Sequence, residues 1–96
     1  MPLYRPPADV ADVARGALAD RRRYGRGGTH VGVRRAVGLV KRRPLEASEL
    51  RVMAAWFKRH DHLASYRADR TSAASISWRL WGGAPARAWL RRVGVR

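Results

Sequence analysis

Apolar residues recur at helical spacing along this chain, and no stretch shows the sustained alternation of apolar and polar residues that is typical of a half-buried strand. The first twenty residues show the pattern most clearly. Their apolar positions follow the i, i+3, i+4, i+7, i+8 spacing of a single helix face: Val10, Val13, Ala14, Ala17 and Leu18. This periodicity predicts an all-α fold.

Prolines and glycines divide the chain into short helical segments. Pro6 and Pro7 open the first segment, since proline fits the first helical turn, and Gly25 is suited to a left-handed stop. Thr29 can cap the second helix, and Pro44 ends it. The expected apolar face of this second helix consists of Val33, Ala36, Val37 and Val40.

The second half of the chain predicts further helices. We expect, in order, a helix from Glu46 or Ser48 to about His60, a polar loop over 61–71, a helix from about Ser72 to Gly82-Gly83, and a short helix from about Pro85. The predicted buried positions are Leu50, Met53, Ala54 and Phe57 in the first of these helices, Ala73, Ile76 and Leu80 in the next, and Trp89 with Val93 in the last.

The length of the chain, 96 residues, allows one modest core but not two. We therefore expect a compact single domain of four to five short helices over residues 1–96. Residues 1–7 would form an N-terminal arm and 94–96 a C-terminal tail. The second and third helices, joined by a tight turn at 43–45, resemble a helix-turn-helix in outline.

Charge is distributed very unevenly along the chain. Residues 21–45 carry nine Lys or Arg and no acid, within a net charge of +14. Such a surface attracts polyanions, and binding through it should weaken steeply with salt. The glycines of the 25–29 turn can form an anion nest at a helix N-terminus, or the turn is a simple connection with Thr29 as an ordinary N-cap. The candidate phosphate-binding residues are Arg21, Arg22, Arg23, Arg26, Gly27, Gly28, Thr29, Arg34, Arg35, Lys41, Arg42 and Arg43.

Asparagine and glutamine are wholly missing from the chain, so these side chains cannot read adenine. The third helix offers only Arg51, Lys58 and Arg59 as outward donors. We therefore expect contacts to nucleic-acid backbone phosphates without base readout. The choices between DNA and RNA, and between single and double strands, stay open.

The tryptophans Trp56, Trp78, Trp81 and Trp89 allow different interpretations. Indoles stack on unpaired bases in single-strand binders, but large aromatics at helical spacing more often pack in a core or anchor an interface. We favour packing, with docking on a protein partner through any indole that the small core leaves exposed. The candidate docking residues are Trp78, Trp81 and Trp89.

Catalytic and metal-binding groups are sparse. The chain has no cysteine, which excludes disulfides, thiolate zinc sites and cysteine nucleophiles. His60 and His62 flank Asp61, but no further ligand stands at metal spacing, so we expect no metal site. The acids resemble caps and ion-pair partners rather than a catalytic pair. We expect no enzyme activity, no cofactor and no small-molecule substrate.

Neither a membrane segment nor a secretory leader is expected. No run approaches the roughly 18 apolar residues of a membrane span, and the first residues lack the apolar stretch of a signal peptide.

Three linked motifs resemble a small uncharacterised module of tailed bacteriophages. This chain has YGRGGT at 24–29 followed by VGVRRA at 31–36, LRVMAAWFKRH at 50–60, and ISWRLWGG at 76–83 followed by ARAW at 86–89. The family pattern is similar to GRGGT-x-VGV-x-RA, RRM-x-x-[FY]F-x-RH and I-x-W-x-LWGG-x-x-x-x-AW, and it covers about residues 10–92. The resemblance implies a viral context, among phage head-gene products.

These observations favour a non-enzymatic, basic phage accessory or virion-associated protein that binds nucleic-acid phosphates, located in the virion or the host cytoplasm. One alternative is a minor capsid, cement or decoration protein that docks on the phage shell through a Trp-rich surface. A further alternative is a host-directed inhibitor of an acidic or nucleic-acid-binding surface.

Overall fold

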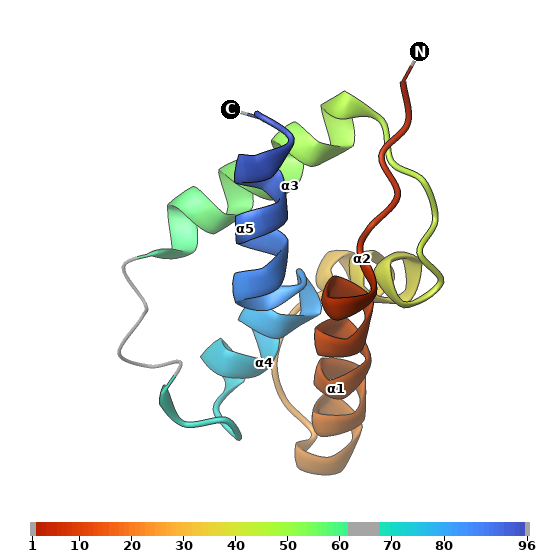
Figure 1. Ribbon diagram of the computed structural model, residues 1–96. Coiled ribbons are helices and arrows are strands. Elements are labelled where there is room, and N and C mark those ends of the chain that lie inside the picture. Colours follow the sequence, from red (N-terminus) through yellow and green to blue (C-terminus); the bar gives the residue numbers. More distant parts are fainter. Residues whose placement is uncertain (1, 62–67, 96) are drawn as a thin grey trace.

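The computed structural model describes residues 2–61 and 68–95, which form five α-helices (Figure 1). These are α1 (Ala8–Tyr24), α2 (His30–Val40), α3 (Ala47–His60), α4 (Ala73–Leu80) and α5 (Gly83–Arg92). The predicted all-α fold is confirmed for this part of the chain. His62, residues 63–67 of the expected loop and the last residue of the expected tail lie outside the described residues. None of the described helices is both long enough and apolar enough to span a bilayer.

Local sequence sets both ends of α1. Pro7 precedes the helix in an extended conformation, and three arginines occupy its last turn, where they complement the helix dipole. Gly25 then adopts the left-handed conformation with φ 63°, and its N–H donates to the Arg21 carbonyl. On the expected apolar face, Val10, Ala14 and Ala17 are buried, while Val13 and Leu18 are half-buried.

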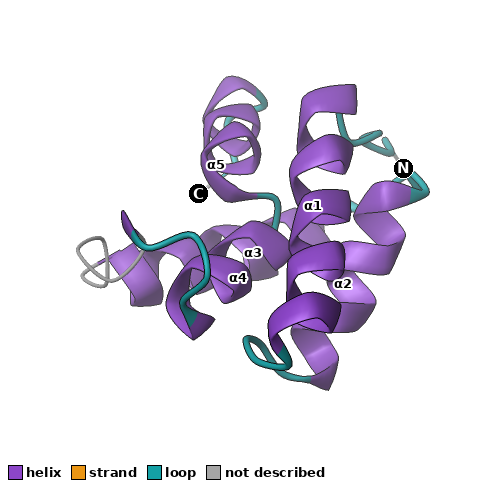
Figure 2. Ribbon diagram, turned by 90° about the horizontal axis from the view of Figure 1, so that it is seen from below, coloured by secondary structure: helices purple, strands orange, loops and turns teal. Residues whose placement is uncertain are grey.

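The helices α1 and α2 form an antiparallel hairpin and lie side by side (Figure 2). Helix α4 packs on both of them, and α5 turns sharply away after Gly82 to pack on α1, α3 and α4. Large side chains from α1, α2, α3 and α4 are fully buried at the centre: Val10, Leu39, Leu50, Met53, Ile76 and Leu80. The hairpin therefore has one face on the core and the other toward solvent.

The buried face of α2 differs from the predicted one. Gly32, Ala36 and Leu39 are buried, whereas Val33, Val37 and Val40 are only half-buried. A Cβ at Gly32 would lie 3.4 Å from the Trp81 indole nitrogen. Because residue 32 has no side chain, the indole approaches α2 closely, and this contact turns the Gly32 side of the helix inward.

Burial in α3 and α4 also differs from the prediction at two positions. Ala54 is half-buried and Ala73 is exposed at the start of α4. Their places in the core are taken by Trp56 and Trp78, whose ring centroids lie 6.0 Å apart. Large aromatic side chains reach across the interface between the two helices, whereas alanine at the helix end cannot.

The second and third helices follow one another along the chain as expected, but each packs mainly on another helix. Helix α2 packs mainly on α1, whereas α3 packs on α5. The chain leaves α2 through Arg42, which has a left-handed φ of 51°, and then runs extended to Leu45. Leu45 is buried and forms an isolated antiparallel bridge with Tyr4 of the N-terminal arm, with both N···O distances 2.8 Å. This bridge carries the start of α3 away from α2.

Candidate nucleic-acid interface

The basic block is the segment 21–45, which carries nine Lys or Arg and no acid. Its cations are distributed along the α1–α2 hairpin and do not converge on the 25–29 turn. Several of its side chains are exposed and make no hydrogen bond or ion pair with the described residues: Arg22, Arg23, Arg34, Lys41 and Arg43. The first two lie at the end of α1, and the last two lie just beyond α2. These groups are at opposite ends of the hairpin, because Arg42 Nε donates to the Pro6 carbonyl at 2.7 Å, beside the start of α1.

Each acid of the chain has a partner outside this block, although the charge of Glu49 also acts on Arg35 and the charge of Arg26 acts on Asp69. Asp12 pairs with Arg15, Asp20 with Arg70 and Arg79, and Asp61 with Arg87. Glu46 and Glu49 form the capping box of α3, Asp9 accepts the Val10 N–H, and Asp69 accepts the backbone and hydroxyl of Thr71. The chain has seven acids, and these contacts account for all of them. Within the described residues, the cations between 21 and 43 therefore have no carboxylate in ion-pair contact.

Packing requires two glycines of the 25–29 turn, Gly27 and Gly28. Gly27 has φ 101°, and a Cβ there would lie 2.6 Å from the Ile76 side chain. Gly28 has φ 74°, and its Cβ would lie 2.4 Å from Leu80. The Thr29 hydroxyl accepts the Gly32 N–H as the N-cap of α2. The turn is thus the close contact between the hairpin and α4, and the N-cap alternative for Thr29 is confirmed.

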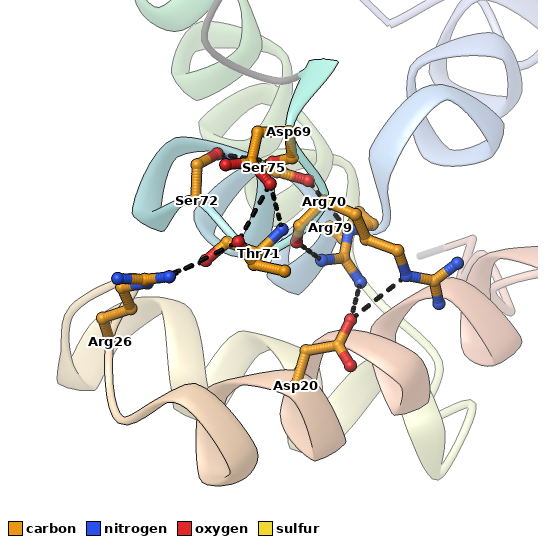
Figure 3. A network of polar contacts seen from close by, with 8 residues as sticks. All are labelled: Asp20, Arg26, Asp69, Arg70, Thr71, Ser72, Ser75 and Arg79. Carbon is orange, nitrogen blue, oxygen red and sulfur yellow. Dashed lines mark hydrogen bonds and ion pairs between the residues drawn. The ribbon is translucent and has the colours of Figure 1, made fainter.

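Three of the predicted phosphate ligands donate hydrogen bonds to backbone carbonyls of the protein and so act as structural braces. Arg21 Nε donates to the Gly27 carbonyl at 2.9 Å, and Arg42 Nε holds Pro6. Arg26 Nε donates to the Thr71 carbonyl at 2.8 Å, across the gap between the 25–29 turn and the start of α4 (Figure 3). Each spans residues that local sequence patterns do not connect, so sequence reasoning could not separate these braces from the free cations.

An ion-pair cluster next to this brace joins α1 to α4 (Figure 3). Asp20 Oδ2 accepts Arg79 Nη1 at 2.8 Å and Arg70 Nε at 3.4 Å. The Asp20 and Arg79 side chains are only 18% and 16% exposed. Their hydrogen bond holds the pKa of the Asp20 carboxyl below its usual value, against the opposing effect of burial. Asp20 therefore forms its ion pairs with Arg70 and Arg79 and with no described cation between residues 21 and 43.

Arg35 is the cation of the block whose Nε is buried. Its guanidinium lies 5.6 Å from the Trp81 ring centroid, and its Nε is buried without a hydrogen-bond partner among the described residues. Burial lowers the pKa of Arg35, while the charge of Glu49 opposes that shift. No spacing signal connects residues 35 and 81, so sequence reasoning treated Arg35 as an ordinary exposed cation.

The predicted docking tryptophans belong to the core. Trp78, Trp81 and Trp89 are 8%, 4% and 5% exposed. We expected docking through any indole that the core leaves exposed, but all three of these indoles are buried. The correction follows from the mutual packing of Trp81 with Trp56 and of Trp78 with Phe57, at centroid distances of 4.9 and 4.8 Å.

Among residues 2–61 and 68–95, no three His, Cys, Asp or Glu side chains gather where they could hold a metal ion. His60 stacks on Trp56 with ring centroids 4.1 Å apart, and its Nδ1 lies 2.8 Å from the Trp56 carbonyl oxygen. A scan against protein-family models, a search of curated proteins and a search of solved structures each returned no match for this chain.

Proposed function

We propose that this protein binds nucleic acids through their backbone phosphates, along the solvent face of the α1–α2 hairpin and without reading bases. The observation that carries the proposal is that, within the described residues, no carboxylate forms an ion pair with a cation between 21 and 43. Much of the positive charge of the block therefore remains available to an external polyanion, with Glu49 as the acid that lies beside Arg35. A basic stripe of this kind is typical of proteins that bind nucleic-acid phosphates.

The free cations are spaced along the hairpin in a way that suits an extended partner. Arg34 and Lys41 are seven residues apart and so lie on nearly the same side, one on α2 and the other just after it. The eleven residues of α2 extend over about 16 Å, or roughly five nucleotide steps of a strand. Arg22 and Arg23 continue the positive surface at the far end.

The same face offers little for base recognition. Its central outward residues are Val31, Arg34 and Gly38, and the chain contains no amide side chain that could pair with adenine. The affinity should therefore come from phosphate contacts, which position a protein without specifying sequence.

The resemblance of the motifs at 24–29 and 76–89 to a phage module supports a role as an accessory or virion-associated protein, acting in the virion or the host cytoplasm. In this proposal the protein has no catalytic role and needs no cofactor.

The test is fluorescence anisotropy of labelled single- and double-stranded DNA over a salt series. The variant Arg22→Gln/Arg23→Gln should weaken binding and reduce the slope of log K against log salt by about one to two. The matched control is Arg91→Gln/Arg92→Gln, an exposed adjacent pair in the last turn of α5 that removes the same charge outside the block. A flat salt response of the wild type, or equal effects of the two variants, would contradict the proposal.

A further inference from the structure

A hollow of about 340 Å³ lies where α2 passes into the connection to α3. Three arginines line it, Arg34, Arg35 and Arg43, together with Glu49 and an apolar floor that includes Leu39 and Leu45. A water takes about 30 Å³ of liquid volume, so this space accepts a phosphate group with several waters. Three cations therefore border one small volume on the hairpin.

Arg35 is held in the hollow by packing and not by an acid. Its guanidinium stacks on Trp81, which in turn stacks on Trp56 in α3. The buried Nε has no acceptor, and no carboxylate forms an ion pair with this side chain. Burial of this cation is unfavourable, and the nearby charge of Glu49 offsets it only in part, since burial is the larger influence on the pKa of Arg35. An anion in the hollow would supply further counter-charge.

Glu49 is the acid among the lining residues, and it opposes an incoming anion. Its Oε2 is already engaged, since it accepts the Glu46 N–H at 2.9 Å in the capping box of α3. The hollow is lined by three guanidinium groups and one carboxylate. That carboxylate already accepts a hydrogen bond from a backbone N–H. The net local charge remains positive.

We propose that this hollow seats a single phosphate group, with Arg35 as the preoriented anchor and Arg34 and Arg43 as flanking cations. Guanidinium groups bind phosphate oxygens in pairs of parallel hydrogen bonds, which makes a fixed arginine a better anchor than a mobile one. The inference rests on the proposed function only in assigning the phosphate to a nucleic-acid backbone. A free phosphate has the same chemistry, and the experiment separates the two sources.

The first arm of the test titrates inorganic phosphate into the full-length protein at constant ionic strength, with chloride as the reference anion. Arginine Nε–Hε signals are followed by NMR. Saturable shifts should be confined to Arg34, Arg35 and Arg43, and they should disappear in Arg35→Gln. The variant Arg43→Gln, which removes an exposed side chain, should weaken phosphate binding with the fold retained. Glu49→Gln keeps a capping acceptor and removes the opposing charge, so phosphate should bind about fivefold tighter.

The second arm measures DNA affinity at moderate salt for Arg35→Gln and for Arg23→Gln, which removes one charge at the other end of the hairpin. The loss should be about tenfold for Arg35→Gln and clearly smaller for Arg23→Gln. If phosphate binding saturates but Arg35→Gln and Arg23→Gln lose equal DNA affinity, the site binds free phosphate and the assignment to a nucleic-acid backbone is overturned. Saturable phosphate binding without any DNA binding would retain the site and refute the proposed function. Shifts that do not saturate, or that spread over all arginines, would overturn the phosphate site itself.

Discussion

The rings of Trp56 and Trp81 stack with their centroids 4.9 Å apart and their planes within 14° of parallel. Trp56 belongs to α3, and Trp81 lies at the junction of α4 and α5, so this contact ties α3 to the rest of the core. Beside them, His60 stacks on Trp56 and Arg35 lies over Trp81. The two indoles are thus central members of an aromatic stack that reaches from α3 to the hairpin.

Loss of this stack should be severe for stability. Trp81→Ala should lower the free energy of unfolding by about 3–5 kcal/mol, because it removes a nearly fully buried indole and leaves a cavity. Urea denaturation followed by far-UV circular dichroism measures the change. Val52→Ala is the comparison, since Val52 is 53% exposed on α3. A loss below 1 kcal/mol for Trp81→Ala would show that the stack does not organise the core.

Two glycines of the hairpin should respond to alanine in opposite directions. Gly27→Ala puts a Cβ 2.6 Å from Ile76 at a left-handed φ, which should destabilise the protein by about 2–4 kcal/mol. Gly38→Ala lies within α2 with open space around the new Cβ, and the higher helix propensity of alanine should stabilise by about 0.5–1 kcal/mol. Thermal melting of both variants tests the pair. Equal shifts would contradict the packing role of Gly27.

The Asp20–Arg79 contact should make stability depend on pH in the acid range. The pKa of folded Asp20 lies below its unfolded value, so the contact stabilises above the unfolded pKa and is lost as the pH falls through the folded pKa. Asp20→Asn should therefore cost about 1–3 kcal/mol at pH 7 and progressively less below about pH 4. Urea unfolding of both proteins from pH 7 to pH 2 gives the difference curve.

Asp12→Asn is the matched control for that curve. Its partner Arg15 and Asp12 itself are 57% and 71% exposed, so the change should be below about 1 kcal/mol at every pH. A constant difference between wild type and Asp20→Asn across the whole pH range would exclude the ion pair as its source.

Arg42 combines an unfavourable backbone conformation with a stabilising side-chain contact. Arg42→Ala keeps the left-handed φ of 51° and loses the hydrogen bond to Pro6, so stability should fall by about 1–2 kcal/mol. Arg42→Gly loses the same bond but relieves the strain, and it should be more stable than Arg42→Ala by about 1 kcal/mol. Urea midpoints rank the two variants. The reverse order would mean that the backbone at 42 relaxes when the arginine is removed.

Binding should be nearly independent of base composition. AT-rich and GC-rich duplexes of equal length should bind with affinities within about threefold, because the expected contacts are to phosphates. Competition between the two duplexes at one salt concentration measures the ratio. A preference of a hundredfold or more would require base or shape readout and would contradict phosphate-only binding.

The helices and their ends were largely determined by short-range sequence signals. Pro7 and Gly25 bound α1, Thr29 caps α2, and Ser72 caps α4, each through contacts within a few residues. Interactions of this range are independent of the rest of the fold, so the chain alone specifies them. The concentration of positive charge between 21 and 45 is likewise a property of the sequence.

The tertiary structure alone decided which cations remain available. Arg26 is engaged 45 residues away by Thr71, Arg42 36 residues away by Pro6, and Arg35 is fixed on Trp81. The same packing buries the tryptophans and the Gly32 side of α2. The spacing of these residues along the sequence is equally compatible with exposed side chains. Such contacts depend on how helices cross in space, and residue periodicity carries no information about partners that distant along the chain.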